Sequence, residues 1–199
     1  WGGPETYPHM AAGWAVALDS PFQWVKQVAS DFGGTRVGMV AHWPKGIKAR
    51  NEIRPQFSHV IDIAPTILEA AGIKAPLAVD GIKQAPIEGT SFAYTFDAAN
   101  ARAPQRHKTQ YFEMMGQWAL YDDGWFLSTK VNRAPWEAFG AANPNPLDNQ
   151  VLELFNLNKD FSQTTNLAAG NSQKVRELKA KFIAEAKKHQ VFPMDASVA

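Results

Sequence analysis

The clearest pattern of apolar and polar positions lies near the C-terminus, in Ser172–His189. Apolar residues recur there at every third or fourth position, with lysines and glutamates between them; the apolar set is Val175, Leu178, Phe182 and Ala186. Because an α-helix turns once in about 3.6 residues, these side chains share one stripe. The pattern predicts an amphipathic helix that packs this stripe on the rest of its domain.

A second helix is predicted between Asp62 and Gly72. Its apolar face is formed by Ile63, Ile67, Leu68 and Ala71. Asp62 offers an oxygen that can cap the N-terminus, and Pro65 lies in the first turn, where a missing N–H costs little. Gly72 is typical of a helix end, because glycine readily adopts a positive φ angle.

The chain before this helix predicts one further helix and one strand. Residues 21–31 show a looser helical spacing, which the Gly33-Gly34 pair interrupts. Residues 37–41 form a short apolar run that closes before Pro44, and this suits a buried strand because proline cannot donate to a sheet ladder. Residues 1–20 are rich in glycine, proline and alanine, so we expect a loop there.

From Lys108 onward the pattern is typical of an antiparallel sheet. Residues 109–115 and 151–157 have strand character, and the apolar runs 119–121 and 125–127 flank Asp122-Asp123-Gly124. Asp-Gly pairs adopt the positive φ angles of a tight turn, so this stretch predicts a β-hairpin.

The composition of the chain argues against several classes of partner and site. The 199 residues carry a formal net charge of +1, which gives no electrostatic reason to expect nucleic acid as a partner. The sequence contains no apolar run of about 18 residues, so we expect no membrane span. It also contains no cysteine, which excludes disulfides and thiolate metal sites. The chain starts at Trp1 without an initiator methionine, so we expect a fragment of a longer protein.

Lys26 and His9 are the candidate site residues. Lys26 precedes the Gly33-Gly34 pair, where a lysine can bring a point charge to an oxyanion while glycines let backbone approach closely; the alternative is a solvated surface lysine. His9 could face a pocket from the opening loop. None of the five histidines forms a metal-type pair, so no metal ligand is predicted.

Carboxylates in or beside the hairpin allow two interpretations. Asp122, Asp123 and Glu113 could form an acid–base pair, but a turn accounts for them without further assumptions.

Four stretches, taken in order along the chain, resemble type I sulfatases (arylsulfatases) of the alkaline-phosphatase-like superfamily. The family's lysine, Gly-Gly-x-Arg and Trp-Pro-x-x-Ile series resembles Lys26, Gly33–Arg36 and Trp43–Ile47. Its Asp-x-x-Pro-Thr helix resembles His59–Leu68. The family's Asp-Gly … Gly-x-Ser connection resembles Asp80-Gly81 followed by Glu88–Ser91. Its closing Glu-Leu-Tyr-Asp-Leu … Asn-Leu-Ala signature resembles Glu153–Asp160 followed by Asn166–Ala168.

The resemblance implies an α/β fold, with an α+β fragment present here. Residues 1–107 would be the C-terminal end of the sulfatase catalytic domain, an α/β sandwich to which they supply the last strand and helix. Residues 108–199 would be a small antiparallel-sheet subdomain closed by a helix.

The resemblance also implies an activity, which is hydrolysis of sulfate esters by a formylglycine nucleophile with calcium. Lys26 corresponds to the lysine that contacts the substrate sulfate, and Arg36 is expected to buttress the glycine turn. The Cys/Ser-x-Pro-x-Arg motif and the calcium-binding segments of the family are absent. In the family they lie N-terminal to the lysine, so we expect nucleophile and Ca²⁺ ligands outside this chain.

Several expectations follow for the whole protein. The partners are a small sulfate ester and the remainder of the catalytic domain, and the chain alone is expected to be inactive. A phosphonate or phosphate monoester hydrolase of the same superfamily and a non-catalytic binding or assembly module remain as alternatives. The residues do not distinguish the bacterial periplasm from the cytoplasm.

Overall fold

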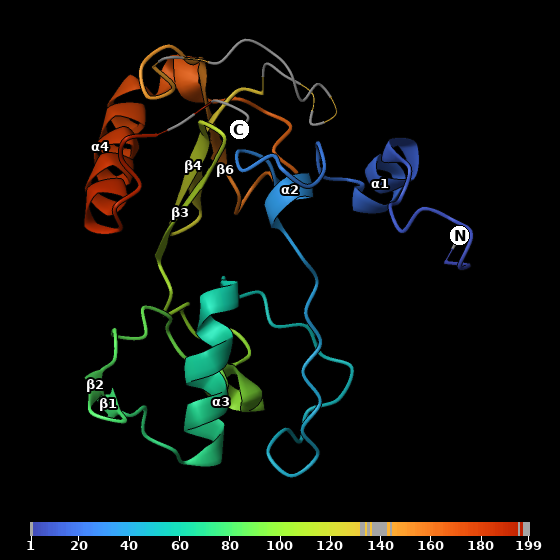
Figure 1. The fold of residues 1–199 in the computed structure, drawn as a ribbon, viewed down its shortest axis with the longest axis vertical. Coiled ribbons are helices and arrows are strands. Elements are labelled where there is room, and N and C mark those ends of the chain that lie inside the picture. The colour runs from blue at the N-terminus through green and yellow to red at the C-terminus, as the bar shows by residue number, and fades with distance from the viewer. Residues whose placement is uncertain are drawn as a thin grey trace. The chain divides into compact units, whose positions relative to one another are not determined.

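The chain divides into two compact units in a computed structural model that describes residues 2–131, 134, 136, 143, 145–194 and 196. Residues 1–37 and 111–199 form the first, which we call the sheet unit; residues 38–110 form the second, the α3 unit (Figure 1). The boundary predicted at residue 108 separates parts of the expected whole protein, and the two units described here do not test it. It stays a prediction.

The sheet unit is built on four antiparallel strands in the order β3-β4-β5-β6. Their bounds are Thr109–Met114, Gln117–Asp122, Trp125–Thr129 and Leu152–Asn156. Asp122 pairs with Trp125, so only Asp123 and Gly124 form the turn, with φ angles of 47° and 93°. The predicted hairpin is confirmed, because two successive positive φ angles are what a two-residue turn between twisted strands requires.

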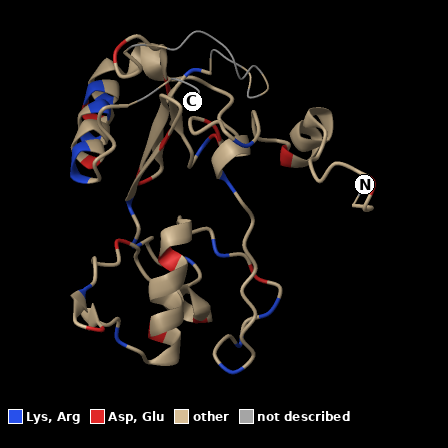
Figure 2. Ribbon diagram, in the orientation of Figure 1, with Lys and Arg blue, Asp and Glu red and all other residues tan. Residues whose placement is uncertain are grey.

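The helix α4, Ser172–Lys188, covers one face of this sheet. Three of its four predicted stripe residues, Leu178, Phe182 and Ala186, are fully buried. The Phe182 ring stacks on the Trp118 ring of β4, with centroids 4.2 Å apart. Lysines and arginines lie along α4, as Figure 2 shows. The predicted amphipathic helix is therefore confirmed.

The opposite face of the sheet is covered by a segment from the beginning of the chain. Phe126 of β5 points away from the α4 face, since neighbouring side chains of a strand alternate and Leu127 lies in the α4 core. Phe32, which starts the short helix α2 (Phe32–Thr35), packs on Phe126 with ring centroids 4.9 Å apart. Both faces of the sheet are thus buried within one unit.

The α3 unit is organised around the helix α3, Ile63–Ala71. A single 3-10 turn, Val60–Asp62, precedes it, and Gly72 ends it with a φ angle of 68°. The predicted helix is confirmed. The connection that follows contains a small hairpin, β1 (Ala78–Val79) with β2 (Ile82–Lys83). The remaining 3-10 turns are Ala93–Phe96 and Ala98–Asn100 here, and Ala168–Gly170 in the sheet unit.

Two expectations for the first 31 residues are wrong. The expected loop contains the helix α1, Ala12–Asp19. Residues 21–31 form turns and bends instead of a helix, because Trp24 and Gln27 have φ angles of 65° and 77°, which a right-handed helix does not tolerate.

The expected strand at residues 37–41 is also not formed. The segment is unpaired among the described residues, and Val37 and Val40 are 87% and 93% exposed. A strand needs a neighbour to satisfy its N–H and C=O groups, and the described part of the chain supplies none at this position.

No helix in the described residues is both long and apolar enough to cross a membrane.

The stacked pair of Phe182 and Trp118 generates a stability prediction. Phe182→Ala should lower the free energy of unfolding by about 3–5 kcal/mol, because it removes a fully buried ring and leaves a cavity between α4 and the sheet. Urea unfolding followed by tryptophan fluorescence measures this. Arg176→Ala, at an exposed position of the same helix, is the control and should change little; equal effects of the two changes would contradict the assignment of the core.

Candidate active-site segment

Lys26 lies on a tightly folded loop of the sheet unit. Its neighbours Val25 and Val28 are 6% and 1% exposed, whereas Lys26 itself is exposed. Its ammonium forms no hydrogen bond or ion pair with any described residue. The loop therefore has a buried apolar side and presents a lysine that is available for an anion.

Gly33 and Gly34 allow the backbone of this loop to pack closely. A Cβ atom on Gly33 would overlap the carbonyl oxygens of Gln23 and Trp24, and one on Gly34 would overlap the carbonyl of Val28. The Gly33 N–H donates to the Gln23 carbonyl over 2.9 Å. Glycine is therefore required at both positions for a steric reason, because the chain on either side of Lys26 approaches too closely for a Cβ atom.

Arg36 lies over aromatic rings. Its guanidinium carbon is 4.1 Å from the centroid of Phe161 and just over 5 Å from the centroids of Phe22 and Phe32. Burial among these groups lowers the pKa of Arg36 from its ordinary value, and Tyr121 partly opposes this shift. Stacked on rings, the guanidinium supports the turn, in keeping with its expected role as a buttress.

Gln163 contacts the Lys26 loop at two points, and the sequence offered no sign of it. The Gln23 side-chain amide donates to the Gln163 carbonyl over 2.8 Å, and the Phe32 N–H donates to Gln163 Oε1 over 2.9 Å. Both hydrogen bonds join residues more than a hundred positions apart, so no local pattern could reveal them.

Asp31 is a buried carboxyl group five residues after Lys26. It is 4% exposed and accepts a hydrogen bond from the Ser30 hydroxyl over 3.1 Å. Burial, the largest effect, raises the pKa of Asp31 to about 6, the Ser30 hydrogen bond opposes this, and the charge of Glu153 adds to it. Asp31 therefore changes charge at mildly acidic pH.

His9 is exposed in the segment before α1, and its ring centroid is 6.2 Å from that of Tyr7. No hydrogen bond or ion pair joins it to Lys26 among the described residues. The assignment of His9 to substrate binding stays a prediction.

The hairpin carboxylates have structural partners. Asp122 pairs with Lys181 of α4 over 2.5 Å, and this bond raises the pKa of Lys181. Glu113 accepts a hydrogen bond from the Gly116 N–H over 2.9 Å. These contacts favour the turn interpretation over the acid–base pair.

Asp62 is the centre of a buried polar cluster in the α3 unit. Instead of capping α3 through its side chain, its carboxylate accepts hydrogen bonds from the N–H groups of His59 and Thr90 over 2.8 and 2.7 Å. His107 Nδ1 lies 2.8 Å from both carboxylate oxygens. The expected N-cap oxygen therefore ties together distant parts of the unit.

The His107 ring lies between two groups that carry oxygen acceptors. Nδ1 faces the Asp62 carboxylate, and Nε2 lies 3.1 Å from the Thr109 carbonyl oxygen, so both ring nitrogens face acceptors. Burial, followed by the charge of His107, lowers the pKa of the neighbouring His59, while Asp62 opposes this shift.

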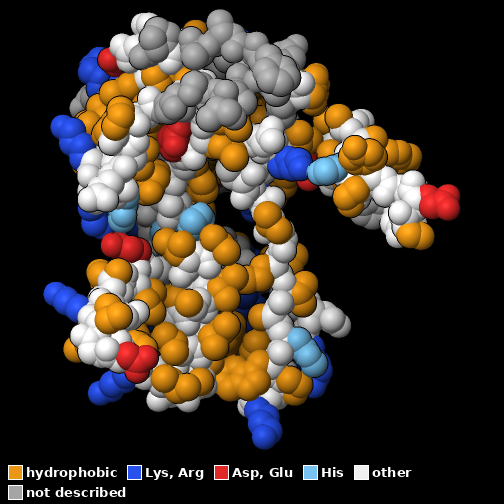
Figure 3. Space-filling model, viewed as in Figure 1, with side chains coloured by type: hydrophobic (Ala, Val, Ile, Leu, Met, Phe, Trp, Pro, Cys, Tyr) orange, Lys and Arg blue, Asp and Glu red, His pale blue; other side chains and the backbone are white. Residues whose placement is uncertain are grey.

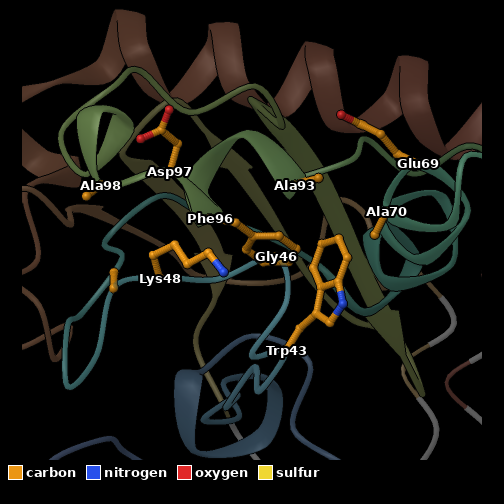
Figure 4. Close-up of a pocket in the computed structure, with 10 residues that line it drawn as sticks. Trp43, Gly46, Lys48, Glu69, Ala70, Ala93, Phe96, Asp97 and Ala98 are labelled. Carbon is orange, nitrogen blue, oxygen red and sulfur yellow. The ribbon is translucent and has the colours of Figure 1, made fainter.

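A pocket of about 510 Å³ opens in the α3 unit, between the segment around Trp43 and the 3-10 turn that contains Phe96 (Figure 4). Its charged lining residues are Lys48, Glu69 and Asp97. The pocket contains none of the predicted site residues. Among the described residues, no group of three or more histidines and carboxylates could hold a metal ion.

A family model described as Sulfatase matches residues 3–73. The match covers the Lys26 loop, the glycine pair and α3. The match confirms the resemblance to sulfatases noted from the sequence.

Solved sulfatase structures share the fold over most of the chain. Ps i-CgsB superposes with a TM-score of 0.63 and 21% identity, over 89% of this chain and 34% of that one. A second structure of Ps i-CgsB, in complex with k-i-k-neocarrahexaose, gives a TM-score of 0.56 and 22% identity over 85% and 32%.

A Bacteroides thetaiotaomicron sulfatase, solved in work on the metabolism of multiple glycosaminoglycans, gives a TM-score of 0.56 and 18% identity over 84% and 32%. The chain spans about a third of the length of these proteins. The expected α/β fold class is confirmed.

The raised pKa of Asp31 generates a prediction for the pH dependence of stability. A folded-state pKa near 6, above the ordinary value of 3.8, means that the folded chain binds this proton more tightly than the unfolded chain. The stabilisation is complete below about pH 4 and is lost as the pH rises through about 6, with a size of about 3 kcal/mol.

Asp31→Asn should remove this dependence, because the amide stays neutral and its oxygen can still accept from Ser30. The variant should match the wild type near pH 4 and exceed it at pH 8. Urea unfolding at a series of pH values measures this, and an unchanged pH profile in the variant would contradict a buried, titrating Asp31.

Proposed function

We propose that the protein containing this chain is an arylsulfatase that hydrolyses sulfate esters through a formylglycine nucleophile, and that Lys26 contacts the substrate sulfate. The observation that carries the proposal is the setting of Lys26. It is an exposed ammonium without a partner among the described residues, on a loop packed through Gly33, within the segment that the Sulfatase model matches.

The chemistry needs a cation at this place. A sulfate monoester carries one delocalised negative charge, and charge collects on the bridging oxygen as the S–O bond breaks. A fixed ammonium at hydrogen-bonding distance stabilises that charge more in the transition state than in the ground state, which accelerates the reaction.

The nucleophile and the calcium ligands are proposed to belong to other parts of the longer protein. The described residues offer no cluster of three or more histidines and carboxylates, so the calcium site of the family does not fit here. The contribution of this chain is therefore limited to binding and orienting the sulfate through Lys26, with His9 as a proposed second contact.

The remainder of the catalytic domain is the proposed partner of an exposed apolar surface on the α3 unit. Val40, Ile53 and Ile67 are 93%, 88% and 61% exposed. Figure 3 shows hydrophobic side chains spread over this unit. Exposed apolar side chains that gather on one surface are typical of an interface, and the unpaired segment 37–41 could add a strand to a neighbouring sheet.

Lys26→Ala in the whole enzyme should lower turnover of an aryl sulfate by about 10- to 1000-fold, because it removes a charge-assisted hydrogen bond to the developing charge. Steady-state kinetics with an aryl sulfate and an aryl phosphonate measure the effect and show which ester is preferred. Stability should hardly change, since Lys26 is exposed.

Lys45→Ala, at an exposed turn after Trp43-Pro44, is the matched control and should be nearly silent. Full activity of the Lys26 variant would remove this residue from the site. A preference for the aryl phosphonate would favour the alternative hydrolase, and no turnover of either ester by the whole protein would favour a binding module.

The 199-residue chain by itself should not hydrolyse sulfate esters. One lysine can stabilise charge, but it cannot replace a nucleophile. Incubation of the purified chain with an aryl sulfate measures this, with the chain carrying Lys26→Ala as the blank. Turnover above that blank would show that the nucleophile lies within these residues.

A further inference from the structure

We propose that Gln163 is a positioning residue that holds both ends of the Lys26 loop and thereby sets the place of the Lys26 ammonium. The inference deepens the proposed function, because it rests on Lys26 as the sulfate contact. Gln163 lies on the loop after β6, within the stretch between Asp160 and Asn166 to which the sequence assigned no role.

The two hydrogen bonds of Gln163 bracket Lys26. Gln23, three residues before Lys26, donates from its side-chain amide to the Gln163 carbonyl over 2.8 Å. Phe32, six residues after Lys26, donates from its N–H to Gln163 Oε1 over 2.9 Å. One residue therefore fixes the entry and the exit of the loop that carries the lysine.

Burial makes these bonds costly to lose. Gln163 is 1% exposed and Phe32 is 5% exposed, so an unpaired Phe32 N–H would have no water to replace the lost acceptor. Gln163 also keeps its Nε2 buried without a hydrogen-bond partner among the described residues. A polar side chain retained at that cost is explained by its acceptor and not by packing, which an apolar residue would provide more cheaply.

The loop that carries Gln163 is itself held in place. The Asp160 carboxylate accepts from the N–H groups of Thr164 and Thr165, both over 2.8 Å, and from the Thr164 hydroxyl over 2.9 Å. Burial alone would raise the pKa of Asp160, but these hydrogen bonds outweigh it and keep the pKa below its ordinary value. Gln163 stands at the centre of this turn with a φ angle of 58°.

Phe161 adds a second pair of contacts on the two sides of Lys26. Its ring lies 5.2 Å from that of Phe22, and the Arg36 guanidinium lies 4.1 Å from its centroid. The turn at residues 160–165 thus contacts both the beginning and the end of the segment that contains the loop.

Loss of the Gln163 acceptor should shift the loop without unfolding it. The Gly33 N–H still donates to the Gln23 carbonyl, and Val25 and Val28 stay buried, so the loop keeps its own shape. Catalysis is sensitive to small displacements of a charged group, because its stabilisation of the transition state depends on geometry. The effect on turnover should therefore exceed the effect on folding.

The test uses the whole sulfatase that contains this chain, with Gln163→Met and Gln173→Met. Methionine fills nearly the same volume but removes Oε1, the acceptor of the Phe32 N–H. Gln173→Met is the matched control, since Gln173 is exposed on α4. Hydrogen exchange over residues 23–33 reports the loop, and kcat with an aryl sulfate reports the site.

We expect Gln163→Met to speed exchange at the Phe32 N–H and to lower kcat by about 10-fold, while Gln173→Met is silent. In a Lys26→Ala background, Gln163→Met should lower kcat no further, because it acts through the lysine.

Three results would overturn the proposal. They are unchanged exchange at Phe32, an equal loss of kcat with and without Lys26, and an equal loss of kcat in Gln173→Met. If Lys26→Ala is silent but Gln163→Met still loosens residues 23–33, the role of Lys26 in catalysis is wrong, whereas the attachment of the loop by Gln163 stands.

Discussion

The contact of Phe32 with Phe126 is the constraint on which the sheet unit depends. The ring of Phe32 covers the sheet face opposite α4, and its N–H donates to Gln163 in the turn after β6. The Gly33-Gly34 pair follows immediately and lets the preceding loop pack against it. Because these contacts meet at one short helix, the apolar core and the backbone of the candidate site are built from the same residues.

The α3 unit depends on a different kind of interaction, a buried charge. Asp62 is fully buried, and its carboxylate gathers two backbone N–H groups and the His107 ring. A buried carboxylate without such partners would be expensive, so the segments that supply them are held close to the start of α3. Thr66 extends the cluster, since its hydroxyl donates to the Asp62 carbonyl and accepts from the Phe92 N–H.

The exposed apolar surface and the exposed lysine are consistent with a chain that works as part of a larger structure. An unpaired run such as residues 37–41 and an ammonium without a partner are both incomplete features in the described chain. A sulfate and a neighbouring sheet are the complements that we propose for them. In the proposed function this chain supplies the cation that contacts the sulfate, and groups outside it break the S–O bond.

Local patterns in the sequence determined the regular elements. The stripe of α4, the Asp-Gly turn and the Gly72 stop each act over a few residues, and each was predictable because helix period and glycine conformation are local properties. The motifs around Lys26 were also visible, and they indicated the family. Tertiary structure alone decided the conformation of residues 21–31, the several hydrogen-bond partners of the Asp62 carboxylate and the two hydrogen bonds of Gln163. These depend on partners up to 140 positions away, and a buried amide or carboxylate has no sequence signature until the fold brings its partners to it.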